Sequence, residues 1–192
     1  MKTTSKASKG FTLIELMVTI ALAAILMLIA IPSFTSFQRN AELTSVTNTL
    51  LAGINAARGE AMKRGRYAMV VPNDGVNWSS GWIVFVDVDR SGTHNSGDID
   101  ILVSEAAPSY LTISGNNTAG ESAPYIMFDA SGYSAKKAGS VSLKNLTLSI
   151  TRNDVAASQT AEQTRRLVIS ITGRARTCKP STDSTCSSSA AQ

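Results

Sequence analysis

Two arginines near the C-terminus, Arg174 and Arg176, have the type and spacing of a phosphate-binding pair. Side chains two residues apart point to the same side of an extended segment. Residues 130–192 carry nine bases against three acids, and the basic residues expected near the pair are Lys136, Lys137, Arg165, Arg166 and Lys179. Such a patch is typical of proteins that bind the DNA backbone. The alternative is that these charges pair with neighbouring subunits or with the acidic segment 74–129, which has eight acids against one base.

Aspartates in the middle of the chain have the spacing of a calcium-binding loop. Asp87, Asp89, Ser91, Gly92 and Asp98 match positions of an EF-hand loop. The match is incomplete, because the last position is an aspartate instead of the usual glutamate and the flanking segments have strand patterns. A hairpin turn rich in Asp, Ser and Gly has the same composition for conformational reasons. The turn interpretation is favoured, and calcium binding stays open.

The sequence contains no residue combination that is typical of catalysis. His94 is the single histidine, belongs to no recognisable motif and is expected to be solvated. A Walker loop, a dinucleotide fingerprint, a Gly-x-Ser-x-Gly turn and a Cys-x-x-Cys pair are all missing from the sequence. We therefore expect a protein that is not an enzyme and that needs no cofactor and no metal.

The apolar segment Phe11–Ile31 contains one ionisable side chain, Glu15. A helix of these 21 residues is about 31 Å long, roughly the thickness of a bilayer core. The bases Lys2, Lys6 and Lys9 precede it, which predicts a single-pass anchor with a cytoplasmic N-terminus. A carboxylate in such a segment is costly, and no base lies within helical reach of Glu15. Its partner is expected outside the chain, or as an amine created by cleavage after Gly10.

The segment Lys9-Gly10-Phe11-Thr12-Leu13-Ile14-Glu15 resembles the prepilin peptidase motif of type IV pilins and type II secretion pseudopilins. The resemblance implies that prepilin peptidase cleaves between Gly10 and Phe11 and that Phe11 becomes N-methylated. It also implies that Glu15 pairs with the terminal amine of a neighbouring subunit during fibre assembly. Residues 1–10 are then a leader peptide and residues 11–31 the transmembrane half of a long helix.

Downstream, residues 32–66 have the pattern of an amphipathic helix, and Gly65 is placed to end it. Residues 67–177 have strand patterns separated by turn residues, which predicts an α+β domain with the helix packed on antiparallel sheet. The apolar helix positions are Leu43, Val46, Leu50, Ile54, Ala57 and Ala61. The predicted strands are Tyr67–Val71, Trp82–Asp87, Ile99–Glu105, Tyr125–Phe128, Val141–Ile150 and Arg166–Thr172.

The segment from Trp78 to Asp87, and the Gly173-Arg174-Ala175-Arg176 segment, resemble the GspH/FimT family of minor pilins and minor pseudopilins. The two tryptophans, Trp78 and Trp82, are expected in the core. The resemblance implies one of two functions. FimT-type members are implicated in capturing double-stranded DNA for natural transformation, whereas H-type and FimU-type members act as structural subunits of a pilus or a type II secretion fibre.

Cys178 and Cys186 are the only cysteines. Beyond the membrane the compartment is oxidising, so a disulfide between them is expected. Residues 178–192 are then a disulfide loop followed by a polar tail. The C-terminal domain is predicted to lie in the periplasm of a Gram-negative bacterium and, after assembly, in the fibre.

Overall fold

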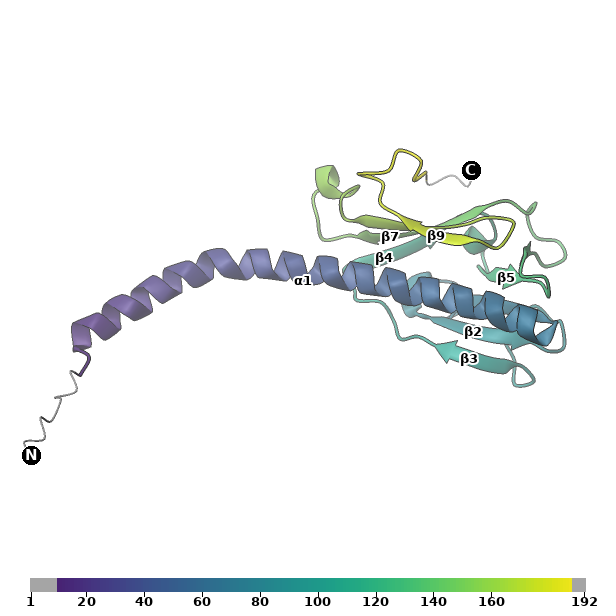
Figure 1. The fold of residues 1–192 in the computed structure, drawn as a ribbon, viewed down its shortest axis with the longest axis horizontal. Coiled ribbons are helices and arrows are strands. Elements are labelled where there is room, and N and C mark those ends of the chain that lie inside the picture. The colour runs from purple at the N-terminus through teal and green to yellow at the C-terminus, as the bar shows by residue number, and fades with distance from the viewer. Residues whose placement is uncertain (1–9, 188–192) are drawn as a thin grey trace, which may run out of the picture. The chain divides into compact units, whose positions relative to one another are not determined.

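The computed structural model describes residues 10–187, apart from the side chains of residues 29, 32 and 33. Most of the predicted leader and the last five residues of the predicted tail therefore lie outside the described residues. The chain divides into two units between Asn40 and Ala41. The helix α1, Leu13–Arg64, belongs to both units and continues through position 32 (Figure 1).

The first unit ends at Asn40 and contains the N-terminal part of α1, and its apolar side chains are exposed. Phe11, Ile14, Leu28 and Phe34 are examples, each with more than half of its surface accessible. Within the described residues, no helical stretch is both long enough and apolar enough to span a membrane. The predicted membrane anchor stays a prediction.

The C-terminal half of α1 supplies one wall of the domain core and ends where the sequence predicts. Five of the six expected apolar positions are completely buried, and Val46 packs against the same core. Gly65 has a φ of 64°, the left-handed conformation that glycine adopts readily. The amide of Arg66 donates to the Ala61 oxygen at 3.2 Å, which closes a Schellman-type helix end.

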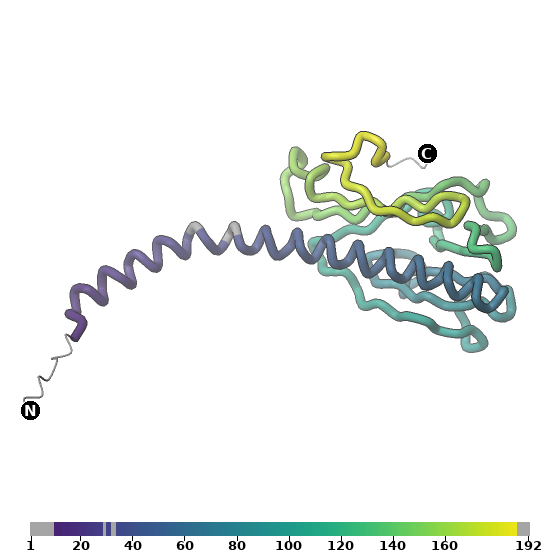
Figure 2. Tube along the Cα trace, in the orientation of Figure 1, coloured from purple at the N-terminus to yellow at the C-terminus, as the bar shows by residue number. Residues whose placement is uncertain are grey.

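Two antiparallel sheets complete the second unit. The first has the order β3-β2-β1-β5-β6, and its strands are β1 (Tyr67–Pro72), β2 (Trp82–Asp87), β3 (Ile99–Val103), β5 (Ile126–Phe128) and β6 (Ser134–Ala135). The second has the order β4-β7-β8-β9, and its strands are β4 (Leu111–Gly115), β7 (Leu146–Arg152), β8 (Thr164–Ile169) and β9 (Ala175–Cys178). Short 3-10 helices follow some strands. β9 is the edge strand of the second sheet and belongs to the yellow C-terminal segment in Figure 2.

Side chains from α1 and from both sheets share one hydrophobic core. Trp78 and Trp82 are each only 2% exposed, which confirms their predicted place in that core. The indole nitrogen of Trp78 donates to the Ala119 oxygen at 2.9 Å. Trp82 lies against Gly53 of α1, where a Cβ would come within 3.2 Å of its Nε1. Trp82 therefore packs the first sheet on α1, whereas Trp78 is held in the core by its bond to Ala119.

The predicted α+β fold is confirmed, with two differences in the strands. Three strands, β4, β6 and β9, were not predicted. The long strand predicted over Val141–Ile150 was wrong at its start, since β7 begins at Leu146. The segment before it is irregular, and the amide of Val141 donates to the Glu121 carboxylate at 3.1 Å instead of joining a sheet.

Candidate functional site

Glu15 takes its hydrogen bonds from inside the chain. Thr12 donates to one Glu15 carboxylate oxygen from its amide and from its hydroxyl, each at 2.9 Å, and the Glu15 amide donates back to that hydroxyl at 3.3 Å. This is a capping box at the start of α1. The Thr12 bonds add no positive charge, so the prediction that an amine of a neighbouring subunit pairs with Glu15 stays a prediction. Gly10 and Phe11, ahead of the helix, are exposed.

Arg174 and Arg176 line one groove of about 290 Å³ on the second sheet. Ala175 between them packs against the core, so the two arginines point to the opposite face of the strand. Arg174 is exposed, and its guanidinium has no hydrogen bond or ion pair with the described residues. The other residues that line the groove are Val168, Ser170 and Thr172. The groove therefore combines two guanidinium groups, which are donors suited to phosphate oxygens, with two hydroxyl groups that bond to each other at 2.7 Å.

A glycine in the left-handed conformation begins the arginine pair. Gly173 has a φ of 79°, and its amide donates to the Ser170 oxygen at 2.9 Å, while the Ser170 amide donates to the Arg174 oxygen at 3.0 Å. A Cβ at Gly173 would lie 1.9 Å from the Gly132 oxygen. The position therefore requires glycine both for its backbone conformation and for space.

The same turn is held from the helix and from the first sheet. Arg58 of α1 donates from Nε to the Gly132 oxygen at 2.9 Å and from a terminal nitrogen to the Thr172 oxygen at 3.4 Å. Ser134 of β6 donates to two main-chain oxygens of the turn, from its amide and from its hydroxyl, each at 2.9 Å. The sequence carried no signal for the Arg58 contacts, because its partners lie 74 and 114 residues away.

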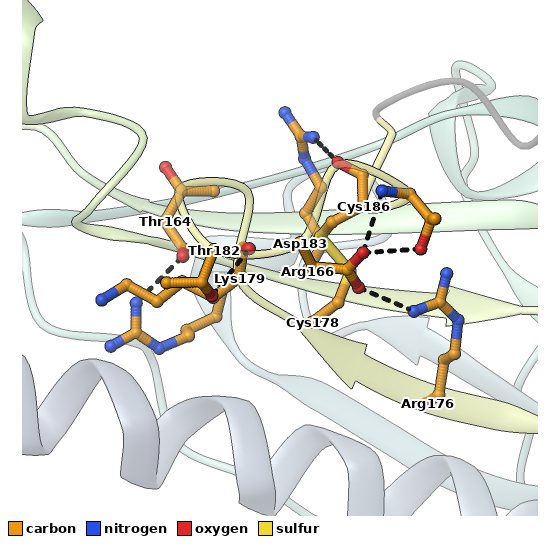
Figure 3. Close-up of a disulfide and its surroundings, with 10 residues drawn as sticks. Thr164, Arg166, Arg176, Cys178, Lys179, Thr182, Asp183 and Cys186 are labelled. Carbon is orange, nitrogen blue, oxygen red and sulfur yellow. Dashed lines mark hydrogen bonds and ion pairs between the residues drawn. A yellow bond between two sulfur atoms is a disulfide. The ribbon is translucent and has the colours of Figure 1, made fainter.

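The predicted disulfide between Cys178 and Cys186 is present and closes a loop beside the groove (Figure 3). Asp183 in this loop lies 3.3 Å from the guanidinium of Arg176. The Asp183 carboxylate also accepts hydrogen bonds from the hydroxyl and the amide of Thr185, at 2.6 and 2.8 Å. The Thr185 bonds, followed by the bond from Arg176, lower the pKa of Asp183. The loop thus places one acidic group at the edge of the basic groove.

The other bases predicted near the pair have partners within the chain. Lys179 forms an ion pair with Glu162, and the hydrogen bond from Lys179 is the main cause of the lowered pKa of Glu162. Arg166 donates to the main-chain oxygen of Cys186, and Arg165 donates to that of Glu162 at 3.0 Å. These bases support the disulfide loop and its surroundings.

Lys136 and Lys137 line a different hollow, of about 420 Å³, beside Asp87 and Arg90. The Lys137 ammonium lies 4.3 Å from the centre of the Tyr125 ring, a cation–π geometry. Burial lowers the pKa of Lys137. The structure therefore separates these two lysines from the groove that Arg174 and Arg176 line.

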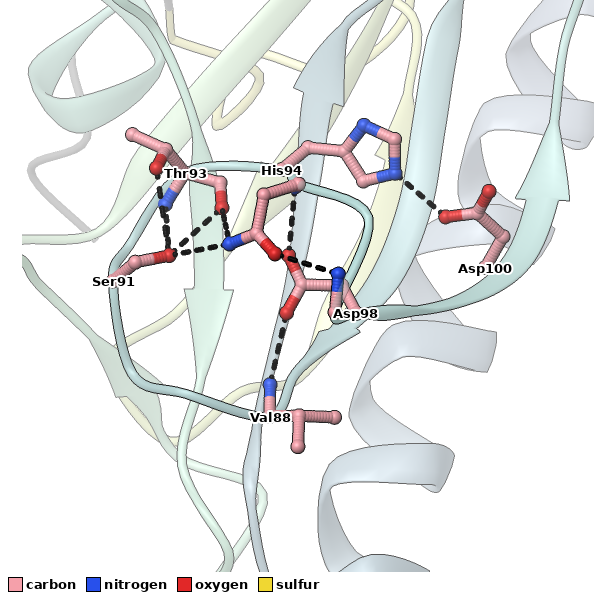
Figure 4. Close-up of polar contacts among 8 residues, drawn as sticks. Val88, Ser91, Thr93, His94, Asp98 and Asp100 are labelled. Atoms are coloured by element: carbon pink, nitrogen blue, oxygen red, sulfur yellow. Dashed lines mark hydrogen bonds and ion pairs between the residues drawn. The ribbon is translucent and has the colours of Figure 1, made fainter.

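The three aspartates of the calcium-like segment lie together, with carboxylate oxygens within 4.8 Å of one another. Asp87 is buried and accepts the amides of Ser91 and Gly92, at 3.1 and 2.9 Å. Asp98 accepts two further amides of the same loop (Figure 4). Burial raises the pKa of Asp87. These bonds fit the turn interpretation, since the carboxylates organise the backbone of their own loop.

His94 in this loop is exposed, as expected, but it also has a partner within the chain. Its Nε2 lies 2.7 Å from the Asp100 carboxylate (Figure 4). Its ring centre lies 5.0 Å from that of Phe85. Asp100 stands on β3, so the contact joins the loop to the edge of the first sheet. The histidine therefore has a structural contact that its lack of a motif did not predict.

Two family models match the chain. The model described as type II transport protein GspH matches residues 46–173, and the prokaryotic N-terminal methylation motif matches residues 5–31. The first match ends directly before Arg174, so both groove arginines lie beyond it.

Solved structures and curated proteins give similarities of two kinds. The type IV minor pilin FimU of Pseudomonas aeruginosa is 22% identical, with a TM-score of 0.54 over 76% of this chain and 94% of that one. The minor pseudopilin EpsH of Vibrio cholerae is 15% identical, with a TM-score of 0.50 over 72% and 98%. Among curated proteins, fimbrial protein Q of Moraxella bovis is 42% identical over 67 residues, 32% of this chain and 43% of the relative. The type IV major alpha-pilin of the same organism is 46% identical over 50 residues, 26% of this chain and 31% of the relative. The chain thus matches less than half the length of either relative.

Proposed function

The chain belongs to the family of type II transport protein GspH, and from this premise we propose that it is a minor pilin or pseudopilin that prepilin peptidase processes between Gly10 and Phe11. The exposed residues Gly10 and Phe11 ahead of α1 support this, because a peptidase needs an accessible junction. Before assembly the protein is anchored in the inner membrane with its C-terminal domain in the periplasm. After processing it becomes a subunit of a fibre.

Glu15 is the proposed assembly carboxylate. Cleavage creates a terminal amine on Phe11, and this amine can neutralise the Glu15 of a neighbouring subunit. Thr12 remains in the processed chain, so the capping box survives cleavage. Its two bonds hold one carboxylate oxygen of Glu15, and the other oxygen, which has no partner among residues 10–187, is the one proposed to meet the neighbour's amine.

The groove that Arg174 and Arg176 line is the proposed DNA-binding site. The observation that carries this proposal is that both arginines face the same groove together with the hydroxyl-bearing Ser170 and Thr172. Guanidinium groups bind phosphate oxygens strongly because charge and hydrogen bonding act together. Contacts of this kind are independent of base sequence. We therefore propose weak, sequence-independent binding of double-stranded DNA for natural transformation.

A purely structural subunit of the H-type is the second candidate. The ion pairs of Arg176 with Asp183 and of Lys179 with Glu162 favour it, since they offset part of the basic charge within the chain. In this account the groove contacts another subunit or nothing at all, and the protein primes or caps a pilus or a type II secretion fibre.

Titration of a labelled DNA duplex with the full chain in non-ionic detergent separates the two candidates. The Arg174→Gln plus Arg176→Gln variant should lose most of the binding, since it removes both guanidinium groups of the groove. The charge-matched control is Lys136→Gln plus Lys137→Gln, which removes two positive charges from the other hollow. Equal losses in both variants would point to overall charge instead of the groove. Absence of wild-type binding at low salt would leave the structural function.

Processing has its own test. Mass spectrometry of protein extracted from membranes should show loss of residues 1–10 and the addition of one methyl group. Glu15→Val should leave cleavage intact and impair incorporation into fibres, because valine cannot pair with a neighbour's amine. Retention of the leader in cells with an active prepilin peptidase would contradict the proposed processing.

A further inference from the structure

We propose that Arg58 of α1 is a positioning residue that holds the turn before Arg174 and Arg176 in the conformation that binds DNA. The proposal rests on the proposed function of the groove. Arg58 lies more than a hundred residues before this turn, and no feature of the arginine motif itself points to it. In this account the helix controls how the second sheet presents its arginines.

The contacts of Arg58 lie where three parts of the domain meet. Its Nε binds the Gly132 oxygen at 2.9 Å, and a terminal nitrogen reaches the Thr172 oxygen at 3.4 Å. A Cβ at Gly173 would lie 2.9 Å from the same Nε and 1.9 Å from the Gly132 oxygen. Gly132 is also restricted, since a Cβ there would lie 2.7 Å from the Met62 sulfur. Both glycines are buried and have positive φ, so Arg58 joins two closely packed turns.

The Arg58 contact can affect the groove arginines because the residue it binds lies directly before them in the chain. Thr172, whose oxygen Arg58 binds, lies two residues before Arg174, and Gly173 lies between them. The Arg174 guanidinium has no hydrogen bond or ion pair among the described residues, so the backbone of the turn sets its position. Loss of the guanidinium bridge would let this turn adopt other conformations. The affinity for DNA then falls by the fraction of molecules that still present both arginines.

A direct contact between Arg58 and DNA is the competing explanation, and Arg58→Lys distinguishes the two. Lysine keeps the positive charge, but its ammonium is a point donor that cannot reproduce a planar fork between two carbonyl oxygens. A phosphate contact would therefore survive the change largely intact, whereas the bridge would not. Arg64→Lys is the matched control, because Arg64 stands on the same helix and binds Glu60 at 2.6 Å instead of the turn.

We expect Arg58→Lys to lower the DNA affinity of the full chain by roughly tenfold, the order of one lost charge-assisted hydrogen bond. Arg64→Lys should leave the affinity within about twofold, as is usual for surface changes away from special contacts. In the background of Arg174→Gln plus Arg176→Gln, Arg58→Lys should have no further effect, because a positioning residue acts through the groups it positions. Unchanged affinity in Arg58→Lys, or an equal loss in the double-variant background, would overturn the proposal.

Hydrogen exchange measured by mass spectrometry tests the bridge without DNA. Arg58→Lys should speed exchange in peptides that cover residues 170–176, while peptides from β1 and β2 keep wild-type rates. Unchanged exchange at residues 170–176 would overturn the positioning role. Faster exchange throughout the domain would overturn it too, because it would show that Arg58 stabilises the whole domain and not this turn in particular. If the wild type does not bind DNA, the proposed function fails, and this measurement still decides whether Arg58 holds the turn.

Discussion

The Oδ2 atom of Asp183 lies 3.3 Å from the Nη1 atom of Arg176, so the disulfide loop places a negative charge against one of the two groove arginines. Both side chains are about one-third exposed. If the groove binds DNA as proposed, a phosphate that approaches Arg176 meets this carboxylate, and the loop limits the affinity of the groove. The contact also explains why an acidic residue lies inside an otherwise basic end of the chain.

Asp183→Asn should raise the affinity for a DNA duplex about two- to fivefold. The substitution removes the charge that competes with phosphate for the Arg176 guanidinium, and the size of the effect is that of an exposed ion pair. Fluorescence anisotropy with labelled duplex measures it. Glu105→Gln, which removes a carboxylate from the segment that follows β3, is the control and should change little. Weaker binding by Asp183→Asn would mean that Asp183 orients Arg176 instead of competing for it.

The loop should respond to acid. In the folded protein the pKa of Asp183 lies below its usual value of 3.8, mainly because of the bonds from Thr185. The ionised carboxylate therefore stabilises the fold at every pH above about 3.8. That contribution is lost as the pH falls through the lower folded value. Amide signals of Thr185 in NMR spectra should therefore shift below about pH 4 in the wild type. In Asp183→Asn this transition should be missing, and its persistence there would assign it to another group.

Gly173→Ala should destabilise the domain more than Gly139→Ala does. Both glycines have a φ near 80°, at 79° and 81°, so each alanine carries a similar left-handed strain of about 1–2 kcal/mol. Gly139 has open space where a Cβ would lie, whereas Gly173 faces the Gly132 oxygen. The clash should cost about 1–3 kcal/mol more. Urea unfolding of both variants measures the difference in the free energy of unfolding. Equal decreases in the two variants would show that the turn can move away from the added Cβ without loss of stability.

Two helix glycines form a second matched pair. A Cβ at Gly59 meets nothing within 4 Å, while one at Gly53 comes within 3.2 Å of Trp82 and 3.3 Å of Val84. Gly59→Ala should stabilise the protein by about 0.5–1 kcal/mol through helix propensity. Gly53→Ala should fall short of that gain, because the packing of Trp82 on the helix is disturbed. A larger increase in the free energy of unfolding for Gly53→Ala than for Gly59→Ala would contradict the close packing of Gly53 against Trp82.

Local sequence patterns predicted the parts of the fold that depend on near neighbours. Helix periodicity located the buried stripe from Leu43 to Ala61, and the end of α1 followed from Gly65. β4 was missed although Leu111 and Ile113 alternate with polar residues, because five residues ending in glycine give a weak signal. β9 was missed because a strand made of Ala175–Cys178 has little strand propensity and depends on pairing with β8.

The functional residues divide in the same way. Arg174 and Arg176 could be placed on one side of the chain from their spacing alone. The Thr12–Glu15 capping box was not predicted, although a threonine followed three residues later by a glutamate is its sequence signature. The contacts of Arg58 and Glu162 with partners far along the chain depend on tertiary structure, and no local pattern predicts them. Asp183 lies only seven residues after Arg176, but their contact depends on how the disulfide loop folds back.

The salt dependence of DNA binding tests the central claim most directly. Each phosphate contact contributes about −0.9 to the slope of log affinity against log salt concentration. The wild type should bind with a slope of about −2 or steeper, and Arg174→Gln plus Arg176→Gln should flatten that slope by about two. Lys136→Gln plus Lys137→Gln should keep the wild-type slope. A double-arginine variant with the wild-type slope would contradict the account, because it would place the phosphate contacts outside the groove.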